Sequence, residues 1–207
     1  MFVGHYGVSF AAKKAEPAVP LWVLFIAVQF LDVLWSLCIL LGIEKVRIVP
    51  GITASNPLDL YYMPYTHSLI AAIVWSVAAA AVYRKPGASV VGVAVFSHWV
   101  LDFVVHRPDL PLYDNSAKVG LGLWNFPAVA LGLEAALLFG GMWLYFRLGA
   151  ARRTAMLVFG VVMLAIQAYV FFGPPPASDK AAAVTALVSY VVFALIIRAL
   201  ERRPMPA

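Results

Sequence analysis

The sequence predicts an all-α, polytopic membrane protein, and three observations carry this prediction. Hydrophobic residues make up 63% of the 207 residues, while charged residues make up only 12%. The mean hydropathy is +0.89, and a soluble domain of this length could not bury so much apolar surface. The apolar residues also gather in runs of roughly twenty, the helical length that crosses the ~30 Å core of a bilayer.

Six of these runs predict transmembrane helices in one integral membrane domain that covers residues 1–207. A shorter apolar segment at about residues 2–12 precedes them and is too short to span, so it predicts a re-entrant, half-inserted or interfacial helix. Lys13 and Lys14 follow this segment instead of preceding it, unlike the charges of a signal peptide. The predicted spans lie at about 18–42, 66–83, 88–106, 123–146, 154–173 and 181–200, with ends placed to within about two to four residues.

The basic residues predict the orientation of these spans. Ten of the 15 Lys and Arg residues fall on one side and the other five on the opposite side. The positive-inside rule places the side with ten basic residues, and with it the C-terminus, in the cytoplasm. Loops 43–65 and 107–122 then lie on the outer side of the cell membrane. The pI near 9.4 then reflects topology and contact with anionic lipid, and nothing resembles a nucleic-acid surface. The ten residues are Lys13, Lys14, Arg84, Lys85, Arg147, Arg152, Arg153, Arg198, Arg202 and Arg203.

Five ionisable groups interrupt the apolar segments: His5, Asp32, His67, His98 and Asp102. Such groups are costly at membrane depth, so they usually face the protein interior and mark a functional site. At ~1.5 Å rise per residue, Asp32, His98 and Asp102 lie roughly 18, 16 and 22 Å above the cytoplasmic ends of their helices. His67 begins its helix near the outer face. We therefore expect the groups to converge in the outer half of the membrane, with His5 folding back against the main bundle.

The residue types point to a divalent metal, with zinc preferred. Imidazole and carboxylate groups are the usual ligands of zinc and related ions. His98 and Asp102 have i, i+4 spacing and therefore share one helix face. A catalytic site leaves one coordination position for water, whose pKa the metal lowers. The sequence therefore predicts a metal site formed by His5, Asp32, His67, His98 and Asp102.

Other polar residues near this set have open roles. His106 ends the third predicted span and, taken alone, is best interpreted as an interfacial or hydrogen-bonded side chain. Glu134 in the fourth span is a candidate base, a further ligand or a structural partner. Asp102 or Glu134 is the candidate general base, and Arg107 is a candidate partner for a substrate phosphate. Gln29 is interpreted as a helix-packing residue.

The motifs also resemble those of a known family. Gly4-His5, Asp32, Thr66-His67-Ser68 and Ser97-His98-x-x-x-Asp102 occur in the order found in the membrane-bound metal-dependent hydrolases, which are related in ligand pattern to zinc-dependent phospholipase C. The resemblance covers roughly residues 1–127 and leaves residues 128–207 as supporting helices. It implies metal-dependent hydrolysis of a lipid-like or phosphoester small molecule.

The chain departs from the family pattern at two places. Residues 30–34 offer one aspartate, Asp32, where the family usually has Pro-Asp-x-Asp. Residues 62–68 lack the His and Arg that usually precede the His-Ser pair. A two-metal site is therefore not implied by this sequence, and the oligomeric state stays open.

Two other functions use similar residues. A small permease or ion-coupled transporter would use the same intramembrane His and Asp groups with Gly- or Pro-broken helices; Gly140-Gly141 is the only such break within a predicted span. A bis-histidine haem protein would need His pairs on facing helices, but the accompanying aspartates suit a harder ion better.

Overall fold

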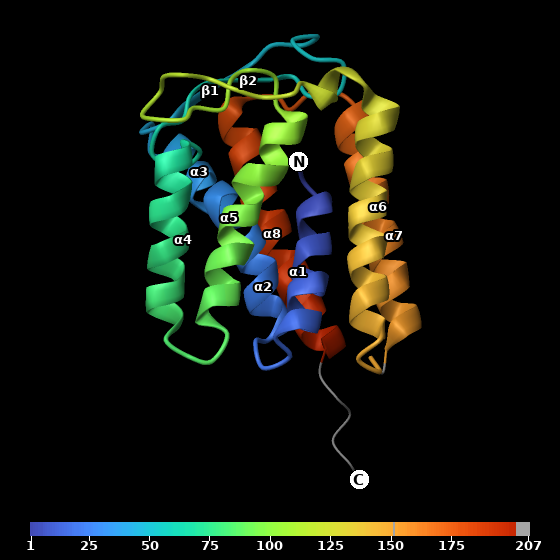
Figure 1. Cartoon of the computed structure of the whole chain (residues 1–207). Coiled ribbons are helices and arrows are strands. Elements are labelled where there is room, and N and C mark those ends of the chain that lie inside the picture. The colour runs from blue at the N-terminus through green and yellow to red at the C-terminus, as the bar shows by residue number, and fades with distance from the viewer. Residues whose placement is uncertain (151, 202–207) are drawn as a thin grey trace.

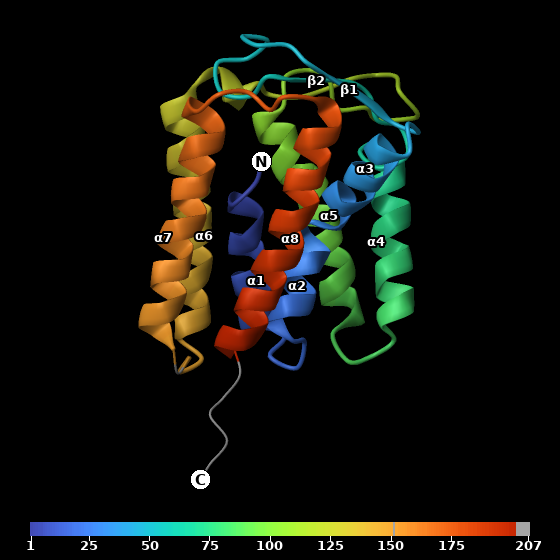
Figure 2. The ribbon, with the colours of Figure 1, turned by 180° about the vertical axis from the view of Figure 1, so that it is seen from behind.

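The computed structural model describes residues 1–150 and 152–201, which form a bundle of helices closed at one end by long loops (Figure 1). The C-terminal end of α8 lies at the opposite end (Figure 2). Arg202 and Arg203, two of the ten basic residues assigned to the cytoplasmic side, lie outside the described residues. The elements are α1 (Gly4–Ala15), α2 (Leu21–Val28), α3 (Phe30–Leu40), β1 (Lys45–Ile48), β2 (Leu58–Tyr62), α4 (Leu69–Tyr83), α5 (Ala88–Val105), the 3-10 helix η1 (Leu123–Asn125), α6 (Pro127–Phe146), α7 (Arg153–Phe172) and α8 (Asp179–Glu201).

The predicted helical architecture is confirmed, and the predicted number of spans is met in part. Among the described residues, four helices, α5 to α8, are long and apolar enough to cross a membrane, and the bent pair α2–α3 makes a fifth crossing if it is one span. Helix α4 is apolar but has only 15 residues. Its length of about 22 Å falls short of the ~30 Å hydrocarbon core.

The predicted single span at 18–42 is wrong in one respect, because it consists of two helices. α2 and α3 meet at Gln29 with a bend of 54°. The buried Gln29 amide donates a hydrogen bond to the carbonyl oxygen of Phe2, 2.9 Å away. The bend places Asp32 in the first turn of α3, where the positive end of the helix dipole stabilises a carboxylate.

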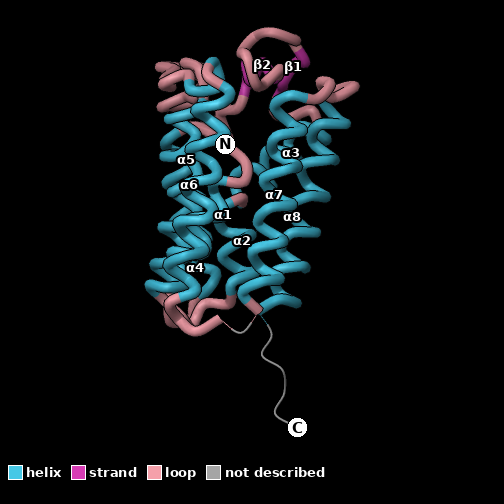
Figure 3. The backbone as a smooth tube through the Cα atoms, turned by 90° about the vertical axis from the view of Figure 1, so that its right-hand side faces the viewer, coloured by secondary structure: helices cyan, strands magenta, loops and turns pink. Residues whose placement is uncertain are grey.

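Helix α1 lies inside the bundle beside α6, and not along its surface (Figures 1 and 3). A close approach of the two backbones makes this possible. A Cβ atom on Gly141 would lie 2.0 Å from the Gly7 carbonyl oxygen, and one on Gly7 would lie 2.1 Å from the Leu137 oxygen. Helix α6 runs unbroken through Gly140 and Gly141. These glycines therefore do not break the span, and Gly141 instead admits a neighbouring helix, as small residues do in membrane bundles.

The two long loops form a layer over the end of the bundle (Figure 3). Segment 43–65 contains an antiparallel pair, β1 and β2, which the sequence did not predict. Arg47 and Arg107 both bind Asp59, so the two loops are joined by an ion-pair network. Ser55 also donates a hydrogen bond to the Trp124 carbonyl oxygen. The loops thus form a fixed cover above the helix ends.

Candidate metal centre

All five predicted ligands meet at one place near the loop-covered end of the bundle. Two overlapping groups, His5–His98–Asp102 and Asp32–His67–His98, each bring three donor atoms within 4.8 Å of one another. The expectation that His5 folds back is confirmed, because its ring stacks on the His98 ring with centroids 4.0 Å apart. These residues come from four places in the sequence: α1, α3, the turn before α4, and α5.

The two aspartates lie between the histidines. Asp102 Oδ2 lies 3.1 Å from His98 Nε2 and 3.8 Å from His67 Nε2. Asp32 Oδ1 lies 3.3 Å from His67 Nε2 and 3.6 Å from His98 Nε2. The other oxygen of Asp102, Oδ1, faces His5 Nε2 at 3.3 Å and the Met1 amino group at 2.5 Å.

The ring orientation of His98 is fixed by the backbone. Its Nδ1 lies 2.7 Å from the carbonyl oxygen of Val28. A carbonyl oxygen can only accept, so Nδ1 must carry the hydrogen, and in the neutral ring Nε2 then presents a lone pair. That Nε2 atom is buried and has no hydrogen-bond partner.

His67 is oriented in the same way through a side-chain relay. The Thr66 hydroxyl donates to Glu44 Oε2 at 2.6 Å, so it accepts a hydrogen bond from His67 Nδ1 at 2.8 Å. Burial raises the pKa of Glu44, and hydrogen bonds from Thr66 and the Tyr65 backbone oppose that rise. The relay leaves His67 Nε2 free to face the aspartates. Acceptors behind the ligating histidines are the usual outer shell of a metal site.

His106 belongs to the same cluster, although its sequence position suggested a structural role. Its Nε2 lies 3.5 Å from Asp102 Oδ2, and its Nδ1 is held 2.9 Å from Asp109 Oδ1. Its i, i+4 spacing from Asp102 was the signal that could have identified it.

The donor atoms fit a metal ion. Four donors at tetrahedral directions, each 2.0–2.1 Å from one ion, are separated by roughly 3.4 Å. The four separations between Nε2 of His67 or His98 and the nearer oxygens of Asp32 and Asp102 are 3.1, 3.3, 3.6 and 3.8 Å. Both ring nitrogens of the fully buried His5 also have no hydrogen-bond partner. Because buried polar atoms are rarely left unpaired, these groups can hold a metal ion.

Glu134 positions α1 and does not face the cluster. One oxygen of this fully buried carboxylate accepts hydrogen bonds from the backbone amides of Phe2 and Gly4, at 3.2 and 3.1 Å. The other oxygen accepts one from Gln167 Nε2 at 2.9 Å. Because Gln167 of α7 holds one oxygen and the first amides of the chain hold the other, Glu134 fixes the start of α1, the helix that carries His5. Tyr190 on α8 acts similarly, because its hydroxyl donates to Asp32 Oδ2 at 2.8 Å.

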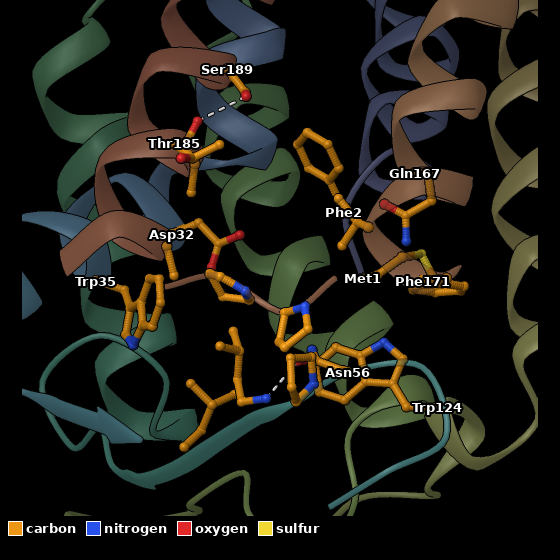
Figure 4. A pocket seen from close by; sticks show the side chains of 18 of the residues that line it. Met1, Phe2, Asp32, Trp35, Asn56, Trp124, Gln167, Phe171, Thr185 and Ser189 are labelled. Atoms are coloured by element: carbon orange, nitrogen blue, oxygen red, sulfur yellow. Dashed lines mark hydrogen bonds between the residues drawn. The ribbon is translucent and has the colours of Figure 1, made fainter. Parts of the chain in front are cut away.

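A pocket of about 420 Å³ reaches the cluster from one side. Asp32, His67, Asp102 and His106 line its inner end, whereas His5 and His98 lie behind them, fully buried. Figure 4 shows Thr185 and Ser189 of α8 on one side of the pocket and residues of α7 on the other. A small molecule can therefore approach the cluster without displacing the buried histidines.

Arg107, the predicted phosphate partner, lies in the loop cover. Its guanidinium is ion-paired with Asp59 and Asp109, and neither Arg107 nor Glu134 lines the pocket. The structure thus brings the five predicted metal ligands together but directs Arg107 and Glu134 to other partners.

Comparison of the chain with protein-family models, with curated proteins and with solved structures found no match. The geometry of the cluster and its pocket is therefore the basis for a functional assignment.

Proposed function

We propose that this protein is a membrane-embedded, metal-dependent hydrolase, with zinc as its metal, acting on a lipid-like or phosphoester small molecule. One observation carries the proposal: imidazole lone pairs and two carboxylates converge at the inner end of a pocket. The sequence resemblance to the membrane-bound metal-dependent hydrolases supports the same reaction class.

The chain's own residues have distinct tasks in this proposal. His67, His98, Asp32 and Asp102 hold the ion, and His5 packs behind it on the His98 ring. A bound divalent ion supplies Lewis-acid activation of the scissile bond and of a water molecule. Thr66 and the Val28 carbonyl keep the two imidazoles oriented. The loop cover excludes bulk water, and the pocket positions the substrate beside Asp32, His67 and Asp102.

The proposal is tested with purified protein reconstituted in lipid nanodiscs. Zinc-loaded protein is expected to release p-nitrophenolate from p-nitrophenyl decanoate or from bis(p-nitrophenyl) phosphate. A chelator should abolish the activity, and added zinc should restore it. The Asp102→Asn variant should be inactive, whereas Asp59→Asn, a carboxylate paired with two arginines away from the pocket, should keep activity. Equal rates for wild type and Asp102→Asn on both substrates would contradict hydrolysis.

We also propose that the full bundle has six crossings of the cell membrane, with α4 as a short span, α1 half-inserted, and the C-terminus in the cytoplasm. The asymmetry of basic residues supports this orientation. In a Cys38→Ser background, which removes the only cysteine, cysteines at the exposed positions Ala54 and Ser116 should react with a membrane-impermeant maleimide in intact cells. A cysteine at Lys85 should react only after permeabilisation. The reverse pattern would invert the topology.

An ion-coupled permease is a second candidate, and the bend at Gln29 favours it. Broken helices beside ionisable groups form the transport sites of many membrane carriers, and the bend lies directly before Asp32. In this case the protein would dissipate or couple to a pH gradient in proteoliposomes, and zinc removal would leave that activity unchanged. Hydrolysis that depends on zinc would favour the first candidate.

A further inference from the structure

The pocket extends from the His/Asp cluster to the lateral surface of the bundle, where it opens between α7 and α8. Its outer part is lined by Ile166, Tyr169 and Val170 of α7 and by Ala182, Thr185, Ala186 and Ser189 of α8. Tyr169 is 64% exposed and Val170 is 49% exposed. Because both helices are long and apolar enough to span a membrane, this opening faces lipid.

The opening has defined limits along the two helices. Helix α7 packs against α6, while α8 packs against α2 and α3, so the two helices are held by different partners. They meet again where Phe159 contacts Phe193, with ring centroids 5.5 Å apart. At the other end, Pro174 to Pro176 of the connecting turn line the pocket. The result is a lateral window between the aromatic contact and the proline turn.

The chemistry of the lining changes along the pocket. The inner end carries the imidazoles and carboxylates, and the outer part carries aliphatic and aromatic side chains with two hydroxyl residues, Thr185 and Ser189. Ser189 Oγ donates to the Thr185 carbonyl oxygen of its own helix, so that hydroxyl is engaged within α8. Among the described residues that line the pocket, none is Arg or Lys, and the amino group of Met1, which also lines it, is ion-paired with Asp102 Oδ1 at 2.5 Å. A fixed negative charge on a ligand would therefore find no guanidinium or lysine partner.

We infer that the pocket binds a single-chain amphiphile, whose uncharged ester or amide head lies at the cluster and whose hydrocarbon chain passes between α7 and α8 into the bilayer. The inference rests on the proposed function for the metal and the reaction. In that reaction water adds its oxygen to the acyl carbon, the C–O or C–N bond breaks, and the leaving group takes the proton. A volume of about 420 Å³ lies in the lower part of the range for small-molecule sites, as expected for one chain and one head.

The test uses two hydroxamic acids, which chelate zinc through a head that resembles an acyl group. Acetohydroxamic acid has no chain, and decanohydroxamic acid has a long one. Their binding to zinc-loaded protein in nanodiscs is measured by calorimetry for wild type, for Ala186→Trp in the window, and for Val188→Trp. Val188 lies on the same helix, is 55% exposed and does not line the pocket, so it controls for a tryptophan on α8.

Ala186→Trp is expected to weaken binding of the decanoyl compound by at least tenfold, because each buried methylene contributes about fourfold to affinity. Acetohydroxamic acid should bind all three proteins equally. One compound partitions into the bilayer to the same extent whichever variant is present, so this partition cancels when variants are compared at one chain length. If Ala186→Trp lowers the zinc content, Val170→Trp, which fills the window from α7, serves in its place.

The outcomes separate this inference from the proposed function. If neither compound binds zinc-loaded wild type, the metal site itself fails. If both compounds bind and the window variants leave the decanoyl affinity unchanged, lateral passage of the chain is wrong while the metal site stands. If wild type prefers a decyl phosphate ester over the hydroxamate, the uncharged head is wrong.

Discussion

Helices α1 to α5 and helices α6 to α8 contribute to the candidate site in different ways. Every candidate ligand lies on α1, α3 or α5 or next to α4 or α5. From the other three helices come Glu134, Gln167 and Tyr190, which hydrogen-bond to the start of α1, to one another or to Asp32. The first group of helices therefore supplies the donor atoms, while the second group holds them in position and forms the lateral window.

The largest effect is expected from a change in the ligand-bearing helices. Asp102 lies within 4 Å of four histidines, so Asp102→Asn removes the group that they share. We expect affinity for zinc to fall more than ~100-fold, beyond the range for second-shell changes. Metal analysis of purified protein measures this loss.

Asp59→Asn is the matched control for this change, because Asp59 is also a buried, ion-paired aspartate. It should keep the wild-type zinc content. An equal zinc content in wild type, Asp102→Asn and Asp59→Asn would show that Asp102 is not needed to bind zinc. The distinction between donor helices and supporting helices would then be wrong.

A change at the contact between the two groups of helices should come next. In Gly141→Ala the new Cβ atom would lie 2.0 Å from the Gly7 carbonyl oxygen, so α1 must move away from α6. Overpacking of this kind costs about 1–3 kcal/mol. We expect a lower thermal midpoint and weaker zinc binding, because His5 moves with α1.

Gly140→Ala provides the comparison within the same helix. A Cβ atom there meets nothing within 4 Å, and alanine favours a helix over glycine by about 1 kcal/mol. This variant should be as stable as wild type or slightly more so. Similar losses in both variants would show that α6 is sensitive to helix composition and not to the contact with α1.

The smallest effect is expected from a supporting residue. Glu134→Gln keeps the shape of the side chain but turns an amide NH₂ toward donors of the α1 backbone or Gln167. Zinc should still bind at saturation, with an affinity roughly tenfold lower, as for second-shell changes. Zinc titration of the metal-free protein measures this shift. Asp179→Asn, a half-buried acid at the start of α8, should leave the affinity unchanged.

The long apolar helices were predictable because burial in lipid imposes one simple pattern on them. Helices α7 and α8 begin and end within about two residues of the predicted spans. The bend at Gln29 was not predictable, since the partner of its amide is the Phe2 carbonyl, 27 residues away. Local composition around Gln29 is apolar and favours one continuous helix, so the 54° bend depends on a tertiary contact.

The candidate ligands were predictable for a related reason. A histidine or aspartate inside an apolar run is conspicuous, and the spacing of His98 and Asp102 places both on one face. The groups that orient them were not predictable. Glu44 and Thr66 act through a relay between two loops, and Tyr190 reaches Asp32 across 158 positions of sequence. No spacing rule connects residues on separate elements.

The contact of Gly4 with Glu134 joins residues 130 positions apart, and this has a consequence in time. At about 5–20 residues per second, a ribosome needs on the order of ten seconds to make α6 after α1 has emerged. During that interval α1 has no glycine-faced neighbour to receive it, and Lys13 and Lys14 can hold it at an anionic membrane surface. His5 therefore reaches its stacked position on the His98 ring only after the second half of the bundle has been inserted.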